Sequence, residues 1–225
     1  MHYFAGWSWG SAMVFGSLIT ATDPVAVIAA FKEARVHGRL KLLVEAESLL
    51  NDGTAAVAFG IATIFALGGS LSASAAIVSF VTAFGGGIAV GLAVAYACLF
   101  LAGKTDDHLV EITFTTVAAY GSFLLAERFH WSGVLASMTA GLIVGNCGSL
   151  GSITDRGREA VRAFWEYSAF LSNSLIFLLI GAHLTEHRFG GMASIALAIT
   201  LVTASRAAVT YLGCVLFARS SVRVD

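Results

Sequence analysis

Long charge-free runs alternate with short charged segments along this chain of 225 residues. The longest run covers residues 53–103 and contains no Asp, Glu, Lys or Arg, so it is too long for one membrane-spanning helix and suits two. Further runs cover residues 129–154, 167–185 and 190–218, of which the last is interrupted only by Arg206. Segments of this length and polarity are typical of helices that cross a bilayer.

The pattern predicts seven transmembrane helices and hence an all-α polytopic membrane protein, with residues 1–225 forming one transmembrane domain. Because a lipid-embedded backbone must satisfy its hydrogen bonds internally, and because alternating polar positions are absent, helices are favoured over a β-barrel. The expected spans cover residues 8–31, 42–67, 73–102, 108–127, 131–147, 161–184 and 190–217. Glycine pairs four residues apart, at 6/10, 87/91 and 141/145, predict close helix packing.

The composition excludes a soluble domain and a disordered chain, because hydrophobic residues make up 57% and charged residues only 12%. A formal net charge of −1 gives no electrostatic basis for nucleic-acid binding. The three cysteines, Cys98, Cys147 and Cys214, lie far apart and match neither a disulfide framework nor a zinc site.

The basic residues predict the orientation of the chain. Ten of the 13 lysines and arginines fall in alternating loops on one side, whereas the opposite loops hold only Arg128 and Arg188. Cytoplasmic loops are enriched in Lys and Arg, so we expect the first set in the cytoplasm and a cytoplasmic C-terminus in the plasma (inner) membrane. The first set comprises Lys32, Arg35, Arg39, Lys41, Lys104, Arg156, Arg158, Arg162, Arg219 and Arg223.

The first concentration of polar groups inside an apolar stretch is Thr22-Asp23-Pro24. Pro24 lacks an N–H and clashes with the preceding turn, so it frees backbone carbonyls near residues 17–20, and it pushes Asp23 out of helical geometry. A helix broken at mid-membrane depth offers carbonyls and helix-end dipoles to an ion. The alternative is a kinked helix in which Asp23 caps the second half.

The second concentration contains Glu45, Glu47, Ser48, Asn51 and Asp52. On a helix, Ser48 and Asp52 share a face, as do Glu47 and Asn51. Acids at this density are too costly to face lipid and must converge on a protein interior or a wet cavity. Repulsion and desolvation then favour a carboxylate that binds either a proton or a small cation, which is the competition that an exchanger needs. A polar helix–helix contact is the alternative.

Arg206 is the only basic residue deep in a predicted span, and a buried guanidinium demands a partner. Glu47 and Glu45 are the candidates. We expect Arg206 to form a structural ion pair rather than to contact a transported ion.

Two motifs make the chain recognisable. ATDPVAV at residues 21–27, followed by ESLLNDG at residues 47–53, resembles the paired signature of the cation:proton antiporter-1 family, the sodium/proton exchangers of the NhaP and NHE type. Residues 119–127, 132–136, 140–146 and 175–181 are similar to later helices of that family, in the same order.

The resemblance implies an inverted-repeat fold with two broken, crossing helices and a mobile core, usually as a homodimer. It implies electroneutral exchange of one Na⁺, or another small cation such as K⁺, for one proton. By resemblance Asp52 carries proton and cation alternately, Asn51 is its neutral neighbour, and Arg206 pairs with Glu47. The remaining cation ligands would be the Thr22 backbone, Asp23, Ser48 and Glu47.

The family has about a dozen or more spans, so seven indicate a partial chain that lacks about three helices before Trp7 and at least one after Arg219. The expected function is secondary active Na⁺ (or K⁺):H⁺ antiport by alternating access, with no enzymatic reaction and no cofactor. A cation channel and an inactive structural membrane fragment are the rival hypotheses. An intramembrane aspartyl protease using Asp23 and Asp52 is disfavoured, because its Gly-x-Gly-Asp motif is missing.

Overall fold

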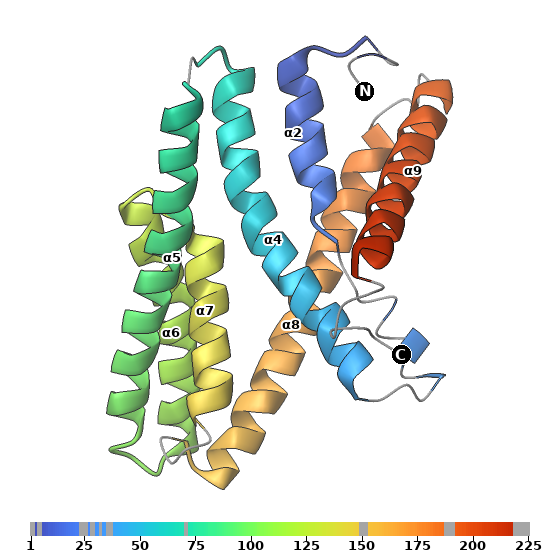
Figure 1. The fold of residues 1–225 in the computed structure, drawn as a ribbon. Coiled ribbons are helices and arrows are strands. Elements are labelled where there is room, and N and C mark those ends of the chain that lie inside the picture. Colours follow the sequence, from blue (N-terminus) through green and yellow to red (C-terminus); the bar gives the residue numbers. More distant parts are fainter. Residues whose placement is uncertain are drawn as a thin grey trace.

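The computed structural model describes residues 3, 6–22, 27, 30, 31, 33, 34, 38–69, 72–148, 153–186 and 192–217. These residues form seven long helices and no strand (Figure 1). The helices are α2 (Trp9–Thr20), α4 (Arg39–Ala66), α5 (Ala73–Ala102), α6 (His108–Arg128), α7 (Gly133–Cys147), α8 (Asp155–Glu186) and α9 (Met192–Phe217).

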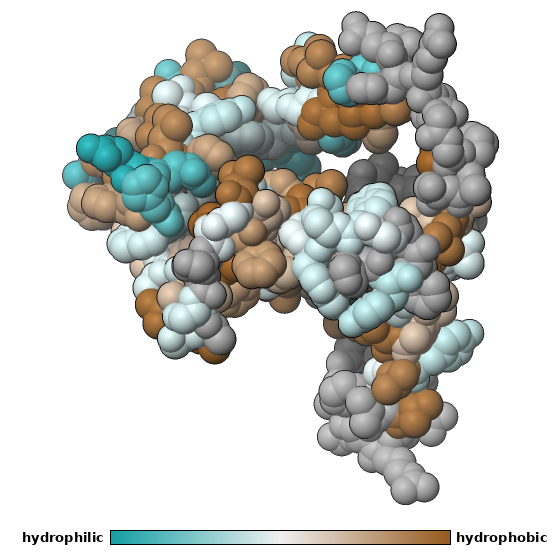
Figure 2. All heavy atoms as spheres, turned by 90° about the horizontal axis from the view of Figure 1, so that it is seen from above, coloured by the Kyte–Doolittle hydropathy of each residue, from teal (hydrophilic) through white to brown (hydrophobic). Residues whose placement is uncertain are grey.

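The predicted all-α membrane architecture is confirmed. Five of the described helices are long and apolar enough to cross a bilayer, and α2 and α7 are shorter apolar helices. Figure 2 looks down on the ends of the helices and shows brown apolar residues scattered among paler ones, with a teal hydrophilic patch at the left. Large side chains such as Phe100, Phe170 and Leu179 are mostly exposed.

Hydroxyl and carboxylate caps set where several helices begin. Ser8, Ser72 and Ser132 each accept a hydrogen bond from the main-chain N–H three residues later, at the starts of α2, α5 and α7. Asp107 accepts from the N–H of Leu109 at the start of α6. These polar residues satisfy N–H groups that have no partner within the helix, and they stand directly before the apolar runs.

Two predicted boundaries differ from the structure by more than three residues. The first span was expected to continue to residue 31, but α2 ends at Thr20. The span expected from residue 161 begins at Asp155, because Thr154 caps the helix and charged residues of the first turns continue it beyond its apolar part.

Helices α5, α6 and α7 pack against one another and form the most closely packed part of the described chain (Figure 1). A β-carbon at Gly87 would lie 2.6 Å from the Ser132 carbonyl oxygen, and one at Gly91 would lie 2.4 Å from that of Ala136. The close packing predicted for the 87/91 pair is therefore confirmed.

The other glycine pairs behave differently. An added β-carbon at Gly141 or Gly145 would meet nothing within 4 Å, so the predicted close packing is wrong there among the described residues. In the first pair only Gly10 approaches a neighbouring helix, with an added β-carbon 2.7 Å from the Cα of Ala66. Spacing alone does not tell which face of a helix meets a neighbour.

A second group of helices holds the polar residues. Helix α2 packs on α4, and α9 lies beside α2 on the side away from α5 (Figure 1). Helix α4 also contacts the α5–α7 bundle, where a β-carbon at Gly53 would lie 2.4 Å from Cδ2 of the fully buried Leu135. The residue after Asp52 is therefore where the two groups of helices meet.

Candidate cation-binding site

The candidate site begins where α2 ends. Its 12 residues rise about 18 Å, against about 30 Å for the hydrocarbon core, so a helix that starts at one surface ends inside the membrane. Ala21 follows in an extended conformation, with φ −59° and ψ 131°. Pro24 has no N–H to donate to the carbonyl of Thr20, four residues earlier. Of the carbonyls near residues 17–20 that were expected to be free, those of Ile19 and Thr20 accept from other helices, whereas Asp23 and Pro24 lie outside the described residues.

Helix α4 supplies donors to this unwound end. The Ser48 hydroxyl donates to the Thr22 carbonyl oxygen. The Asn51 side-chain amide donates to the Thr20 carbonyl oxygen at 2.6 Å and to the Thr22 hydroxyl oxygen at 3.2 Å. Two side chains of α4 therefore occupy carbonyls at the end of α2 that the helix itself leaves without a donor.

Arg206 reaches the same carbonyls from α9. Its guanidinium donates to the Ile19 carbonyl oxygen at 2.6 Å and approaches that of Thr20 at 3.5 Å. A cation here faces the negative end of the α2 dipole. No ion pair joins Arg206 to Glu47 within the described part of the chain, so their pairing stays a prediction, and the side chain of Glu45 lies outside that part.

A cavity of about 720 Å³ lies between α2, α4 and α9. It brings together three predicted site residues and Arg206, while Ser48 is buried beside it, with 4% of its surface exposed. The polar lining includes Thr20, Thr22, Glu47, Asn51, Ser205 and Arg206. The lining thus combines hydroxyl groups, one amide and one carboxylate with the Arg206 guanidinium.

Asp52 follows Asn51 in α4, and its side chain is exposed and outside the lining of this cavity. Asp52 lies one turn beyond Ser48 in α4, and it is the Ser48 hydroxyl that contacts the Thr22 carbonyl oxygen. No three acidic, histidine or cysteine side chains of the described ranges converge on one point, so carbonyl and hydroxyl oxygens would have to complete a cation shell.

The sequence predicted free carbonyls near residues 17–20 but not that the Ile19 carbonyl accepts from Arg206. It also did not single out Glu111, a fully buried acid in the first turn of α6 that does not line the cavity. Glu111 could have been noticed as an acid inside the predicted span 108–127, close to the charged segment at residues 104–107.

The fold and this site define a class: a polytopic α-helical membrane protein with a broken helix held by polar and charged side chains. Residues 1–223 match the family described as "Sodium/hydrogen exchanger, transmembrane", and the chain belongs to that family.

Similar proteins come from several bacteria. The chain is 43% identical over 182 residues to the Na⁺/H⁺ antiporter ApNhaP of Aphanothece halophytica, covering 80% of this chain and 35% of the relative. It is 39% identical over 209 residues to the low-affinity Na⁺/H⁺ antiporter NhaS1 of Synechocystis, covering 90% and 39%. It is 36% identical over 204 residues to the Na⁺/H⁺ antiporter NhaG of Bacillus atrophaeus, covering 88% and 39%. The chain thus spans well under half the length of these relatives.

Proposed function

We propose that this chain is part of a secondary active antiporter that exchanges Na⁺, or K⁺, for H⁺ across the membrane by alternating access. The observation that carries the proposal is the unwound end of α2, held by Ser48 and Asn51 of α4 immediately before Asp52. The names of the similar proteins, all Na⁺/H⁺ antiporters, support the same function.

In the proposed cycle the Asp52 carboxylate carries either a proton or the cation. Loss of the proton gives a negative charge, and a partly dehydrated cation then binds between Asp52 and oxygens of Thr22, Asp23, Ser48 and Glu47. Asn51 remains neutral and holds the unwound chain. One titrating acid in place of two makes the exchange one cation for one proton, and the proton gradient drives it without a cofactor.

The assembly and its location belong to the proposal. The bias of basic residues supports a multi-pass protein of the plasma membrane with a cytoplasmic C-terminus. The greater length of the relatives supports a fuller protein with more helices, which we expect to form a homodimer. The names of the relatives disfavour the channel, the inactive fragment and the protease.

The test is dequenching of a pH-sensitive dye in everted vesicles that contain the chain, on addition of Na⁺, K⁺ or Li⁺. We expect Asp52→Asn to abolish the signal, because the amide neither releases a proton nor carries a charge. Asp155→Asn is the matched control, since Asp155 is exposed and forms only a surface pair with Arg158 at 3.3 Å.

A clamp of the membrane potential should leave the signal unchanged. Normal exchange by Asp52→Asn vesicles would disprove the site. Flux that follows the potential would instead identify a channel or an electrogenic exchanger, and vesicles without any signal would identify an inactive fragment.

A further inference from the structure

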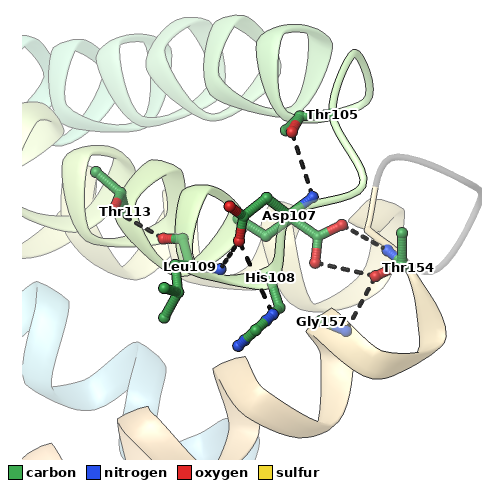
Figure 3. Close-up of polar contacts among 8 residues, drawn as sticks. Thr105, Asp107, His108, Leu109, Thr113, Thr154 and Gly157 are labelled. Carbon is green, nitrogen blue, oxygen red and sulfur yellow. Dashed lines mark hydrogen bonds and ion pairs between the residues drawn. The ribbon is translucent and has the colours of Figure 1, made fainter.

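Glu111 is a buried acid that the proposed exchange does not use. It lies in the first turn of α6, and none of its surface is exposed. Its two carboxylate oxygens accept hydrogen bonds from Thr154, one from the main-chain N–H at 2.9 Å and one from the hydroxyl at 3.2 Å. Thr154 lies beside the start of α6 in Figure 3. A buried carboxylate is retained only where such donors compensate its lost hydration.

These hydrogen bonds complete the cap of α8. The Thr154 hydroxyl oxygen also accepts from the N–H of Gly157 at 3.0 Å (Figure 3). Glu111 therefore places a negative charge at the positive end of the α8 dipole, and it does so from another helix. No basic side chain of the described segments forms an ion pair with Glu111. The carboxylate is therefore held by its two hydrogen bonds from Thr154.

The contact leaves no room for a side chain on α8. A β-carbon at Gly157 would overlap a carboxylate oxygen of Glu111, so a larger residue there would force the Glu111 side chain to move. One turn further along the same face of α6, the Thr115 hydroxyl oxygen accepts from the indole N–H of Trp165 at 3.0 Å. Two polar contacts thus align α8 on α6.

We propose that Glu111 is a positioning residue that locks the N-terminus of α8 to α6, and that the lock stays closed while the protein exchanges cations. The proposal rests on the proposed antiport. Helix α6 is the main packing partner of α8 among the described helices, and α6 is part of the α5–α7 bundle. With the lock closed, α8 moves with this bundle when the bundle and the group of α2, α4 and α9 change their relative position.

A reversible disulfide tests the lock. Glu111→Cys and Gly157→Cys are combined in a chain whose Cys98, Cys147 and Cys214 are replaced by Ala. Because a β-carbon at Gly157 would meet the Glu111 carboxylate, we expect cysteines at the two positions to come close enough for a disulfide. Reduction removes the lock, and oxidation replaces it by a covalent bond.

We expect the disulfide to form, the reduced pair to exchange at least about fivefold more slowly than the cysteine-free parent, and the oxidised pair to come within about twofold of it. Equal rates for the reduced pair and the parent would overturn the positioning role. A disulfide that stops exchange until a reductant is added would show that the lock must open. Failure of the disulfide to form would show that the two positions are not adjacent.

A second pair of variants avoids cysteines. Thr154→Val removes the hydroxyl at nearly constant volume and should slow exchange, whereas Thr154→Ser keeps the hydroxyl and should restore it. Equal rates for Val and Ser would contradict the lock. If the cysteine-free parent shows no exchange that depends on Asp52, the proposed antiport fails instead, and the two failures are thereby distinguished.

Discussion

At the residue scale, the polar side chains of α4 bind main chain more than they bind one another. The sequence predicted free carbonyls near residues 17–20, because Pro24 removes a donor. It did not predict that Ser48 and Asn51 bind carbonyls of this stretch, because Ser48 was expected to be a cation ligand and Asn51 a neutral neighbour of Asp52. The attachment of Arg206 to the Ile19 carbonyl was not predictable, because the sequence analysis considered only acidic side chains as partners.

The contribution of the Asn51 hydrogen bonds to stability can be measured. Asn51→Ala removes two hydrogen bonds to the end of α2 and should lower the free energy of unfolding by about 1–3 kcal/mol, because the Thr20 carbonyl loses its nearest donor. Thr54→Ala is the control, since the Thr54 hydroxyl bonds only to carbonyls of its own helix. Thermal unfolding in detergent compares the two, and equal midpoints would contradict the anchor.

At the element scale, apolar runs predicted most helix boundaries well, and the capping residues sharpened them. The span predicted to end at residue 102 matches the end of α5, and the span predicted to begin at residue 108 matches the start of α6. The approach failed for α2, whose apolar run continues past its end at Thr20, and for α8, which begins among charged residues. Hydrophobicity indicates which part of a helix lies in the bilayer, whereas proline and capping residues indicate where the helix itself ends or begins.

The packing of α5 on α7 gives a matched test. Gly91→Ala should destabilise the protein by roughly 1–3 kcal/mol, because its β-carbon would lie 2.4 Å from the Ala136 carbonyl oxygen. Gly141→Ala gains the same helix propensity and meets nothing within 4 Å, so it should be neutral or slightly stabilising. A higher unfolding temperature for Gly91→Ala than for Gly141→Ala would show that α5 and α7 do not pack in this way.

At the scale of the whole molecule, the described helices form two groups that meet at Gly53 and Leu135. The number and order of the described helices, α2 and α4–α9, were predictable from hydrophobicity. Which helices belong together was not, because every apolar face is equally compatible with lipid or with a neighbour. The sequence also did not show that the polar cavity lies between α2, α4 and α9.

The orientation can be tested with single cysteines in loops on opposite sides of the membrane. In a cysteine-free chain, Asp106→Cys should react with a membrane-impermeant maleimide in everted vesicles, and His130→Cys should react in intact cells. Asp106 follows α5 and His130 follows α6, so one helix separates them. The reverse labelling would place the N-terminus inside and would contradict the orientation drawn from the basic residues.

The termination of α2 at Thr20 also determines how deep the aqueous pathway must be. A helix rising about 18 Å through a layer of about 30 Å leaves about 12 Å between the unwound stretch and the opposite boundary. Under the proposed antiport, and for an α2 that begins at one boundary, water entering from the opposite boundary to this stretch would leave an ion with about 18 Å of protein to cross. The gate of such an antiporter would then need to seal only part of the bilayer, which small displacements of packed helices can do.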